Sequence, residues 1–240
     1  MGILDSVFGK KSALPNSIRE TLFGDMPLAQ WPLDGSLSAI VPWNMFLLAR
    51  SHLASGRQDA ACECWQQVIE HPGLEPRQYA QAWTFLRQNG KTPAPDVAKQ
   101  VLGVVVEVAL RDGLDVVAAY PDHSARYYHN SGAGVVWEHP DSSLDRQIEE
   151  VVEAAKVAVA RIGPWTQARP SPPPRGQARL SFLTPSGLHF GQGKMGALER
   201  DQIGGPVLHT ATVLMQALAA KTRAGMVSAF VERDKDPSGT

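Results

Sequence analysis

The sequence predicts an α+β protein in which an N-terminal helical hairpin module docks on an antiparallel sheet with two covering helices, in the order ββββαββα. Apolar residues recur at helical spacing through residues 43–90. Short runs of β-branched and aromatic residues, separated by turn formers, fill residues 101–138 and 178–190. Two long amphipathic segments, one after each group of strands, supply the covering helices.

Turn-forming residues divide the chain. The expected parts are an N-terminal arm with short helices (1–42), a helical hairpin module (43–92), an antiparallel-sheet domain (96–222) and a disordered polar tail (232–240). The arm carries four prolines and a short helix at 18–23. Inside the sheet domain, the proline-rich stretch 163–176 excludes helix and inner strand, so it is an extended connection.

Three helices are expected in the hairpin module, over residues 43–54, 60–70 and 76–88. Gly56 marks the first turn, and Asp59 stands where a side chain caps the second helix. Small residues occupy the positions where neighbouring helices must touch.

This pattern resembles the tetratricopeptide repeat. The matching residues are Leu48 and Ala49 at the Leu-Gly pair, Gly56 at the turn, Ala61 at the second small residue, Trp65 at the large aromatic and Ala82 one period on. His52 departs from the motif's tyrosine, Gly73 from its closing proline, and only one and a half repeats are present. The resemblance implies a module that binds other polypeptides.

The sheet begins with residues 101–110, a nearly continuous apolar run typical of a strand buried on both faces. Glu107 interrupts it and is interpreted as an edge-facing charge, because a buried unpaired carboxylate is costly. Alternating runs at 114–120, 125–129 and 134–138 complete a four-stranded meander.

The second half of the domain starts with a helix that begins at Ser142 or Ser143 and ends at Ile162. Strands at 178–183 and 188–190, a glycine-rich loop and a helix at 206–221 follow. With a preceding helix, this order resembles the fold of secretion chaperones. That resemblance implies binding of extended client segments without catalysis.

Composition narrows the class of partner. The chain has 240 residues, with Lys+Arg 23 against Asp+Glu 24, so no basic surface for nucleic acid is expected. Cys62 and Cys64 lie two apart on a helix, where they can neither bridge nor form a zinc motif, which indicates a reduced, cytoplasmic setting. No apolar run is long enough to span a membrane. Residues 2–11, with Gly2 in a loose myristoylation pattern, allow membrane contact.

Binding residues are expected among aromatic and arginine side chains, which are enriched at interface hot spots. Arg126 and Tyr128 share one strand face, opposite Tyr127 and His129. The full candidate set is Tyr79, Trp83, Arg126, Tyr128 and Trp137. The sequence therefore predicts a non-catalytic protein-binding adaptor or chaperone-like protein that uses no cofactor, with its partner and oligomeric state left open.

An alternative is a small-ligand-binding or hydrolytic enzyme that uses the loop 187–196. Its candidate residues are His189, Gly191, Gly193 and Lys194. A Walker A phosphate loop would need glycine at Leu188 and a hydroxyl residue at Met195, so that motif is excluded. Adjacent acid, base and hydroxyl residues at 122–124 splay apart in a turn and form no triad. His123, His129, His139 and His189 match no known ligand spacing, so no metal site is expected.

Overall fold

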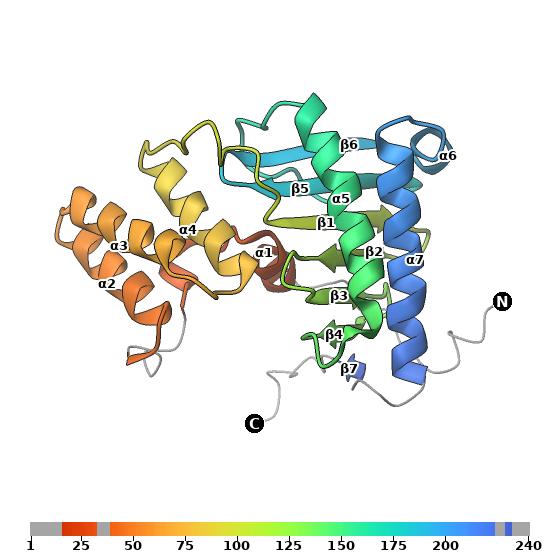
Figure 1. Ribbon diagram of the computed structural model, residues 1–240, viewed down its shortest axis with the longest axis horizontal. Coiled ribbons are helices and arrows are strands. Elements are labelled where there is room, and N and C mark those ends of the chain that lie inside the picture. The colour runs from red at the N-terminus through yellow and green to blue at the C-terminus, as the bar shows by residue number, and fades with distance from the viewer. Residues whose placement is uncertain (1–15, 33–38, 224–228, 232–240) are drawn as a thin grey trace, which may run out of the picture.

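The computed structural model describes residues 16–32, 39–223 and 229–231. It confirms an α+β fold in which N-terminal helices pack on an antiparallel sheet (Figure 1). The N-terminal helices are α1 (Asn16–Phe23), the 3-10 turn η2 (Leu28–Gln30), α2 (Trp43–Ala54), α3 (Gln58–Glu70) and α4 (Pro76–Gln88). The predictions for residues 2–11 and for the tail 232–240 lie outside the described residues.

The strand order across the sheet is β6-β5-β1-β2-β3-β4-β7. Its first four strands are β1 (Gly103–Ala109), β2 (Leu114–Ala119), β3 (Ala125–Tyr128) and β4 (Ala133–Trp137). After them come η4 (Ser142–Leu144), α5 (Asp145–Arg161), β5 (Gln177–Thr184), β6 (Gly187–Lys194), α6 (Met195–Leu198), α7 (Gly204–Arg223) and β7 (Ala229–Val231). The ββββαββα order is confirmed, and β7, which the sequence analysis did not assign, adds a strand beside β4.

The helical module packs through small residues, as expected. Ala49, Ala61 and Ala82 have no exposed surface, which lets the helix backbones approach closely. Around them, the aromatic ring of Phe85 lies 5.3 Å from that of Trp65 and 6.1 Å from that of Phe46, measured between centroids. The prediction that Asp59 caps α3 is wrong, because the helix begins at Gln58 and no side chain caps it. Hydrophobic burial rather than capping therefore fixes this turn.

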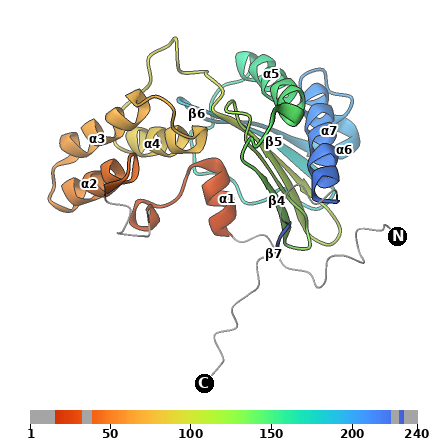
Figure 2. The same cartoon turned by 60° about the horizontal axis from the view of Figure 1, so that its bottom comes forward.

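The two faces of the sheet bury different helices. Figure 2 shows α5 and α7 on one side of the sheet, which we call the first face, and α1 and α4 on the other side, which we call the second face. Val104 and Val106 of β1 belong to the core under α5 and α7, whereas Val105 belongs to the core with α1 and α4. Burial on both faces explains the near-continuous apolar run of β1.

The module docks on the second face through a close contact between the end of α1 and α4. Gly24 has φ +60°, and a Cβ atom there would lie 2.8 Å from the Cβ of Ala80, so only glycine fits. The buried Gln81 side chain accepts from the Met26 N–H and donates to its C=O, both at 3.0 Å. The chain after α1 is thereby fixed to α4.

The expected strand at 188–190 is confirmed, but the glycine-rich loop expected after it, within residues 187–196, is wrong because the strand continues to Lys194. β6 pairs with β5 without interruption from Gly187 opposite Thr184 to Lys194 opposite Gln177. The backbone groups of these glycines form the interstrand hydrogen bonds as those of any other residue do. Pairing with β5 therefore overrides the preference of glycine for turns.

Glu107 is fully buried, which overturns its interpretation as an edge-facing charge. It points from the central strand β1 toward α1, where one carboxylate oxygen accepts from Arg19 Nε at 2.7 Å and contacts Arg19 Nη2 at 2.6 Å. Arg179 Nη1 of β5 lies 3.6 Å from the other oxygen. The carboxylate is paired rather than alone, which removes the objection to its burial.

We expect Glu107→Ala to lower the free energy of unfolding by roughly 3–5 kcal/mol, because two buried guanidinium groups lose their counter-charge. Urea denaturation measures this change. Glu150→Ala is the matched control, since Glu150 pairs with the exposed Arg146 and its loss costs at most about 1 kcal/mol. Equal effects of the two substitutions would contradict the structural role of Glu107.

Candidate functional site

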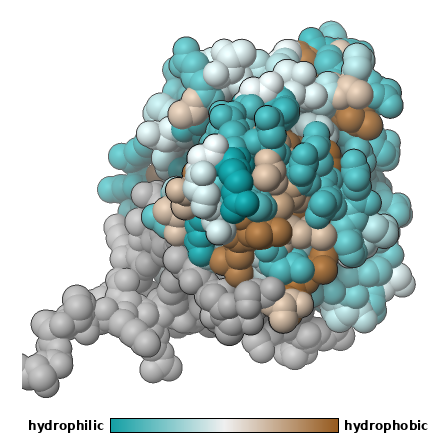
Figure 3. Space-filling view, turned by 90° about the vertical axis from the view of Figure 1, so that its left-hand side faces the viewer, coloured by the Kyte–Doolittle hydropathy of each residue, from teal (hydrophilic) through white to brown (hydrophobic). Residues whose placement is uncertain are grey.

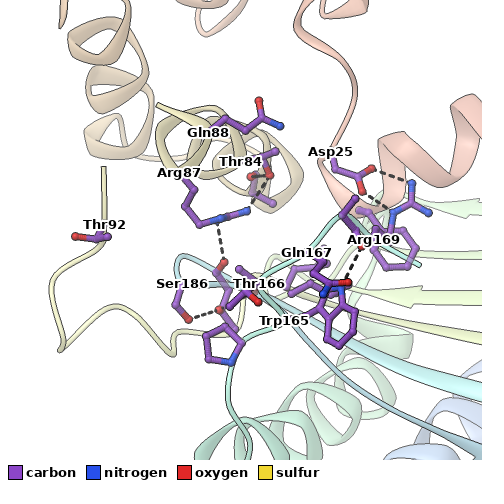
Figure 4. Close-up of a pocket in the computed structure, with 18 of the residues that line it drawn as sticks. Asp25, Thr84, Arg87, Gln88, Thr92, Trp165, Thr166, Gln167, Arg169 and Ser186 are labelled. Carbon is purple, nitrogen blue, oxygen red and sulfur yellow. Dashed lines mark hydrogen bonds and ion pairs between the residues drawn. The ribbon is translucent and has the colours of Figure 1, made fainter. Parts of the chain in front are cut away.

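A cavity of about 740 Å³ lies between the helical module and the sheet. Its wall is formed by the end of α4 with the residues after it, by the segment 164–169, and by the turn between β5 and β6 (Figure 4). Phe23 and Asp25, which follow α1, also line it. We call this space the seam cavity, because it opens where the module meets the sheet domain.

Arg87 of α4 forms part of the wall. Its Nη1 donates to the Pro185 carbonyl at 2.8 Å and to the Thr184 carbonyl at 3.5 Å, and its Nη2 donates to Thr84 Oγ1 at 3.1 Å. All these acceptors are neutral, and no carboxylate of the described residues forms an ion pair with Arg87. Burial lowers the pKa of Arg87 to about 10, so the side chain still carries its charge at neutral pH.

The segment 164–169 forms the opposite wall and lies along the edge strand β6. The backbone N–H of Trp165 donates to the Leu188 carbonyl at 2.6 Å, which makes a single β-bridge. The indole is 39% exposed and packs edge-on against Phe190, with ring centroids 5.3 Å apart. An aromatic surface this open beside a cavity can accept an apolar group.

An ion pair forms part of the lining of the seam cavity. Arg169 Nε and Nη2 contact the two oxygens of Asp25 at 2.5 and 3.0 Å. The Arg169 guanidinium also lies 4.4 Å from the ring centroid of Phe23. In contrast to Arg87, this arginine is neutralised, and it joins the 164–169 segment to the chain after α1.

A serine–histidine pair lies at the β5–β6 turn. Ser186 Oγ is 3.1 Å from His189 Nε2 and 2.9 Å from Thr184 Oγ1. Ser186 lines the seam cavity, whereas His189 is fully buried. Burial lowers the pKa of His189, and the backbone of Ile162 opposes that shift. The imidazole is therefore neutral at pH 7.

The predicted binding residues do not gather at one surface. Tyr79 holds the turn before α4, because its hydroxyl donates to the His71 carbonyl at 2.6 Å. Trp83 packs in both the module core and the second-face core. Arg126 and Trp137 are buried, and Arg126 pairs with Glu138. Tyr128 is half-buried on the second face of the sheet.

The residues of the alternative site are also separated. Gly191, Gly193 and Lys194 continue along β6, where Lys194 is exposed. His129, at the end of β3, contacts Ser131 and lies across the sheet from His189. Of the four histidines considered, only His123 and His139 come together.

Sequence reasoning missed Arg87, Trp165 and Ser186. The one available signal is the spacing of Ala80, Thr84 and Arg87, which places an arginine on the packed side of a helix. Such an arginine has either a buried counter-charge or a ligand.

No protein-family model, no curated protein and no solved structure matches this chain. The resemblances to the tetratricopeptide repeat and to secretion chaperones therefore stay predictions. None of the helices within the described residues combines the length and apolarity needed to cross a bilayer.

His189 predicts a component of the pH dependence of stability. Its pKa is lowered in the folded state, so the unfolded chain binds more protons below the ordinary histidine pKa of about 6.5. Stability from this group is present above that pH and is lost as the pH falls toward the lowered value. We expect the melting temperature of the wild type to fall more steeply than that of His189→Asn between about pH 7 and about pH 5. Parallel profiles would contradict this assignment.

Proposed function

We propose that this protein is a non-catalytic adaptor or chaperone-like protein that holds a segment of another polypeptide in the seam cavity. The segment carries a carboxylate, from Asp, Glu or a chain terminus, next to an apolar side chain. The observation that carries this proposal is Arg87, a half-buried guanidinium whose hydrogen-bond acceptors among the described residues are all neutral.

Charge complementarity supports the carboxylate. A guanidinium presents a planar fork of donors that matches a carboxylate, and its hydrogen bonds strengthen when the acceptor is charged. Arg179 and Arg169 have carboxylate partners within the chain. Arg87 lines the same cavity as Arg169, but its hydrogen-bond acceptors among the described residues are all neutral.

The apolar part of the wall supports a segment with an apolar side chain over a small polar metabolite. Phe23, Trp165 and Leu188 line the cavity of about 740 Å³, and a polar metabolite would leave their apolar surface without a matching group. The module on one side and the sheet domain on the other let a partner reach both parts.

A cytoplasmic setting belongs to the same proposal and is supported by two buried, unbridged thiols, those of Cys62 and Cys64. Membrane contact through residues 2–11 is a separate proposal that rests on the sequence alone. Binding to lipid vesicles, compared between the full chain and a variant that lacks these residues, tests it. Those residues lie outside the described part of the chain.

The Ser186–His189 pair favours a second candidate, hydrolysis by a nucleophilic serine. A neutral imidazole 3.1 Å from a hydroxyl at a cavity wall is the minimum arrangement for activating that hydroxyl. It ranks second because no carboxylate orients His189 among its described hydrogen bonds, and because Thr184 also contacts Ser186.

Selection of short random peptides displayed on phage against the full chain tests the binding proposal. We expect the recovered peptides to share a carboxylate beside an aromatic or aliphatic residue. Arg87→Gln removes the charged partner of that carboxylate, worth about 1.5–3 kcal/mol, so binding of the recovered peptides weakens roughly tenfold or more. Fluorescence anisotropy of a labelled peptide measures the affinity.

Arg57→Gln is the matched control, because Arg57 is an exposed arginine of the module outside the cavity wall. Arg87→Lys keeps the positive charge and removes the planar set of guanidinium donors, so it separates the contribution of charge to binding from that of hydrogen-bond geometry. Melting temperatures establish that each variant folds. Recovered peptides without carboxylates, or equal binding by Arg87→Gln, would overturn the proposal.

Labelling with a fluorophosphonate probe tests the hydrolytic candidate. If that candidate is right, the probe modifies Ser186, and both Ser186→Ala and His189→Asn lose the label. Ser131→Ala is the control, since Ser131 contacts His129 at 2.9 Å in a similar pair outside the cavity wall. Absence of labelling at Ser186 removes this candidate and leaves the binding proposal untouched.

A further inference from the structure

Four polar side chains converge where α5 begins. His123 lies in the turn between β2 and β3, His139 in the link after β4, and Asp145 is the first residue of α5, with Glu149 one turn later. One ligand atom each from His123, His139 and Asp145 lies within 4.8 Å of the others. The sequence spacing alone predicted no metal site here.

The strand register explains this convergence. β3 and β4 pair Ala125 with Trp137. Extending that antiparallel register by two residues places His123 opposite His139, just beyond the strand ends. Their ring centroids are 5.1 Å apart.

Asp145 lies between the two imidazoles. Its Oδ1 is 3.0 Å from His139 Nε2, and its Oδ2 is 3.9 Å from His123 Nδ1. The side chains of His123, His139 and Asp145 are 29%, 40% and 24% exposed. An ion in solution can therefore reach the group.

Glu149 selects the tautomer of His123. Its Oε1 is 3.0 Å from His123 Nε2, which therefore donates and leaves the lone pair of Nδ1 directed toward Asp145. A histidine that donates one ring N–H to a carboxylate and offers the other nitrogen is arranged as metal-ligating histidines are.

The backbone is also unusual at both histidines. His123 has φ +62° and His139 has φ +52°, and they are the only non-glycine residues of the described chain with positive φ. Both histidines are flanked by fixed residues: the Tyr120 N–H donates to the Ser124 carbonyl at 3.0 Å across the turn that holds His123, and the buried Trp137 lies two residues before His139. Such strained positions cluster at functional sites.

We propose that His123, His139 and Asp145 bind a divalent transition metal of the zinc class, with Glu149 orienting His123. Two imidazoles and one carboxylate form a ligand set suited to zinc, and three protein ligands leave a fourth position for water or for a group from a partner. Two neutral histidines and two carboxylates carry a charge that balances a dication.

Positive groups near this site are already engaged. Lys221 at the end of α7 donates to Ser143 Oγ at 2.6 Å and lies 5.1 Å from the ring centroid of Trp137. Arg126 pairs with Glu138. The site is also distinct from the seam cavity. It lies at the first residue of α5, whereas the cavity segment 164–169 follows the other end of that helix, and the 17 residues of α5 span about 25 Å. The metal proposal therefore does not depend on the proposed function.

Titration of the full chain, without an affinity tag, against Zn²⁺ in competition with a chromophoric chelator tests this proposal. We expect one Zn²⁺ per chain and a melting temperature that rises with Zn²⁺ concentration. His123→Asn and His139→Asn should each abolish this binding, and asparagine tolerates the positive φ that both positions require. Glu149→Gln should weaken binding roughly 10- to 100-fold, because it removes only the orienting carboxylate.

His209→Asn is the matched control, since His209 is an exposed histidine near the start of α7. It should bind Zn²⁺ as the wild type does. Melting temperatures without metal establish that each variant is folded. If the wild type binds no Zn²⁺ in the micromolar range, or if His139→Asn retains one tightly bound ion, the proposal is overturned.

Discussion

The buried carboxylate of Glu107 is the contact on which the arrangement of this protein depends. The second face of the sheet presents a charge in the middle of β1, and a charge there must be paired before it can be covered. Arg19 supplies the partner from α1 and Arg179 supplies another from β5. Because α1 carries the counter-charge, it has one acceptable position on the sheet, and α4 follows through its contact with Gly24.

The seam cavity is a consequence of that docking. α4 meets the sheet domain beside an irregular, proline-rich segment that cannot pack as closely as a helix or a strand, so space remains between them. The arginines on either side of this space differ in an informative way. Arg169 is matched by Asp25, whereas the acceptors of Arg87 in the described part of the chain are neutral oxygens. Half-buried Arg87 therefore faces an open volume without a carboxylate partner from the described residues.

Local patterns predicted β1, a continuous apolar run buried on both faces, and α5, whose apolar residues recur at helical spacing, because the hydrophobic pattern of each reports directly on which faces are covered. They ended β6 too early, because hairpin pairing with β5 carries the strand on through its glycines. The site could not be predicted because it joins residues distant in the chain: Arg87 and the Pro185 carbonyl are 98 residues apart. His123 and His139 were noted as histidines, but only the β3–β4 register places them side by side.

The bridge between Trp165 and Leu188 has a consequence for self-association. An edge strand with unpaired N–H and C=O groups invites pairing with a second chain and hence aggregation. Here the chain's own 164–169 segment occupies part of the free side of β6, and an exposed lysine, Lys194, ends the strand. At the other side of the sheet, the short β7 pairs with β4. The proline-rich connection thus protects the sheet from intermolecular strand addition as well as linking α5 to β5.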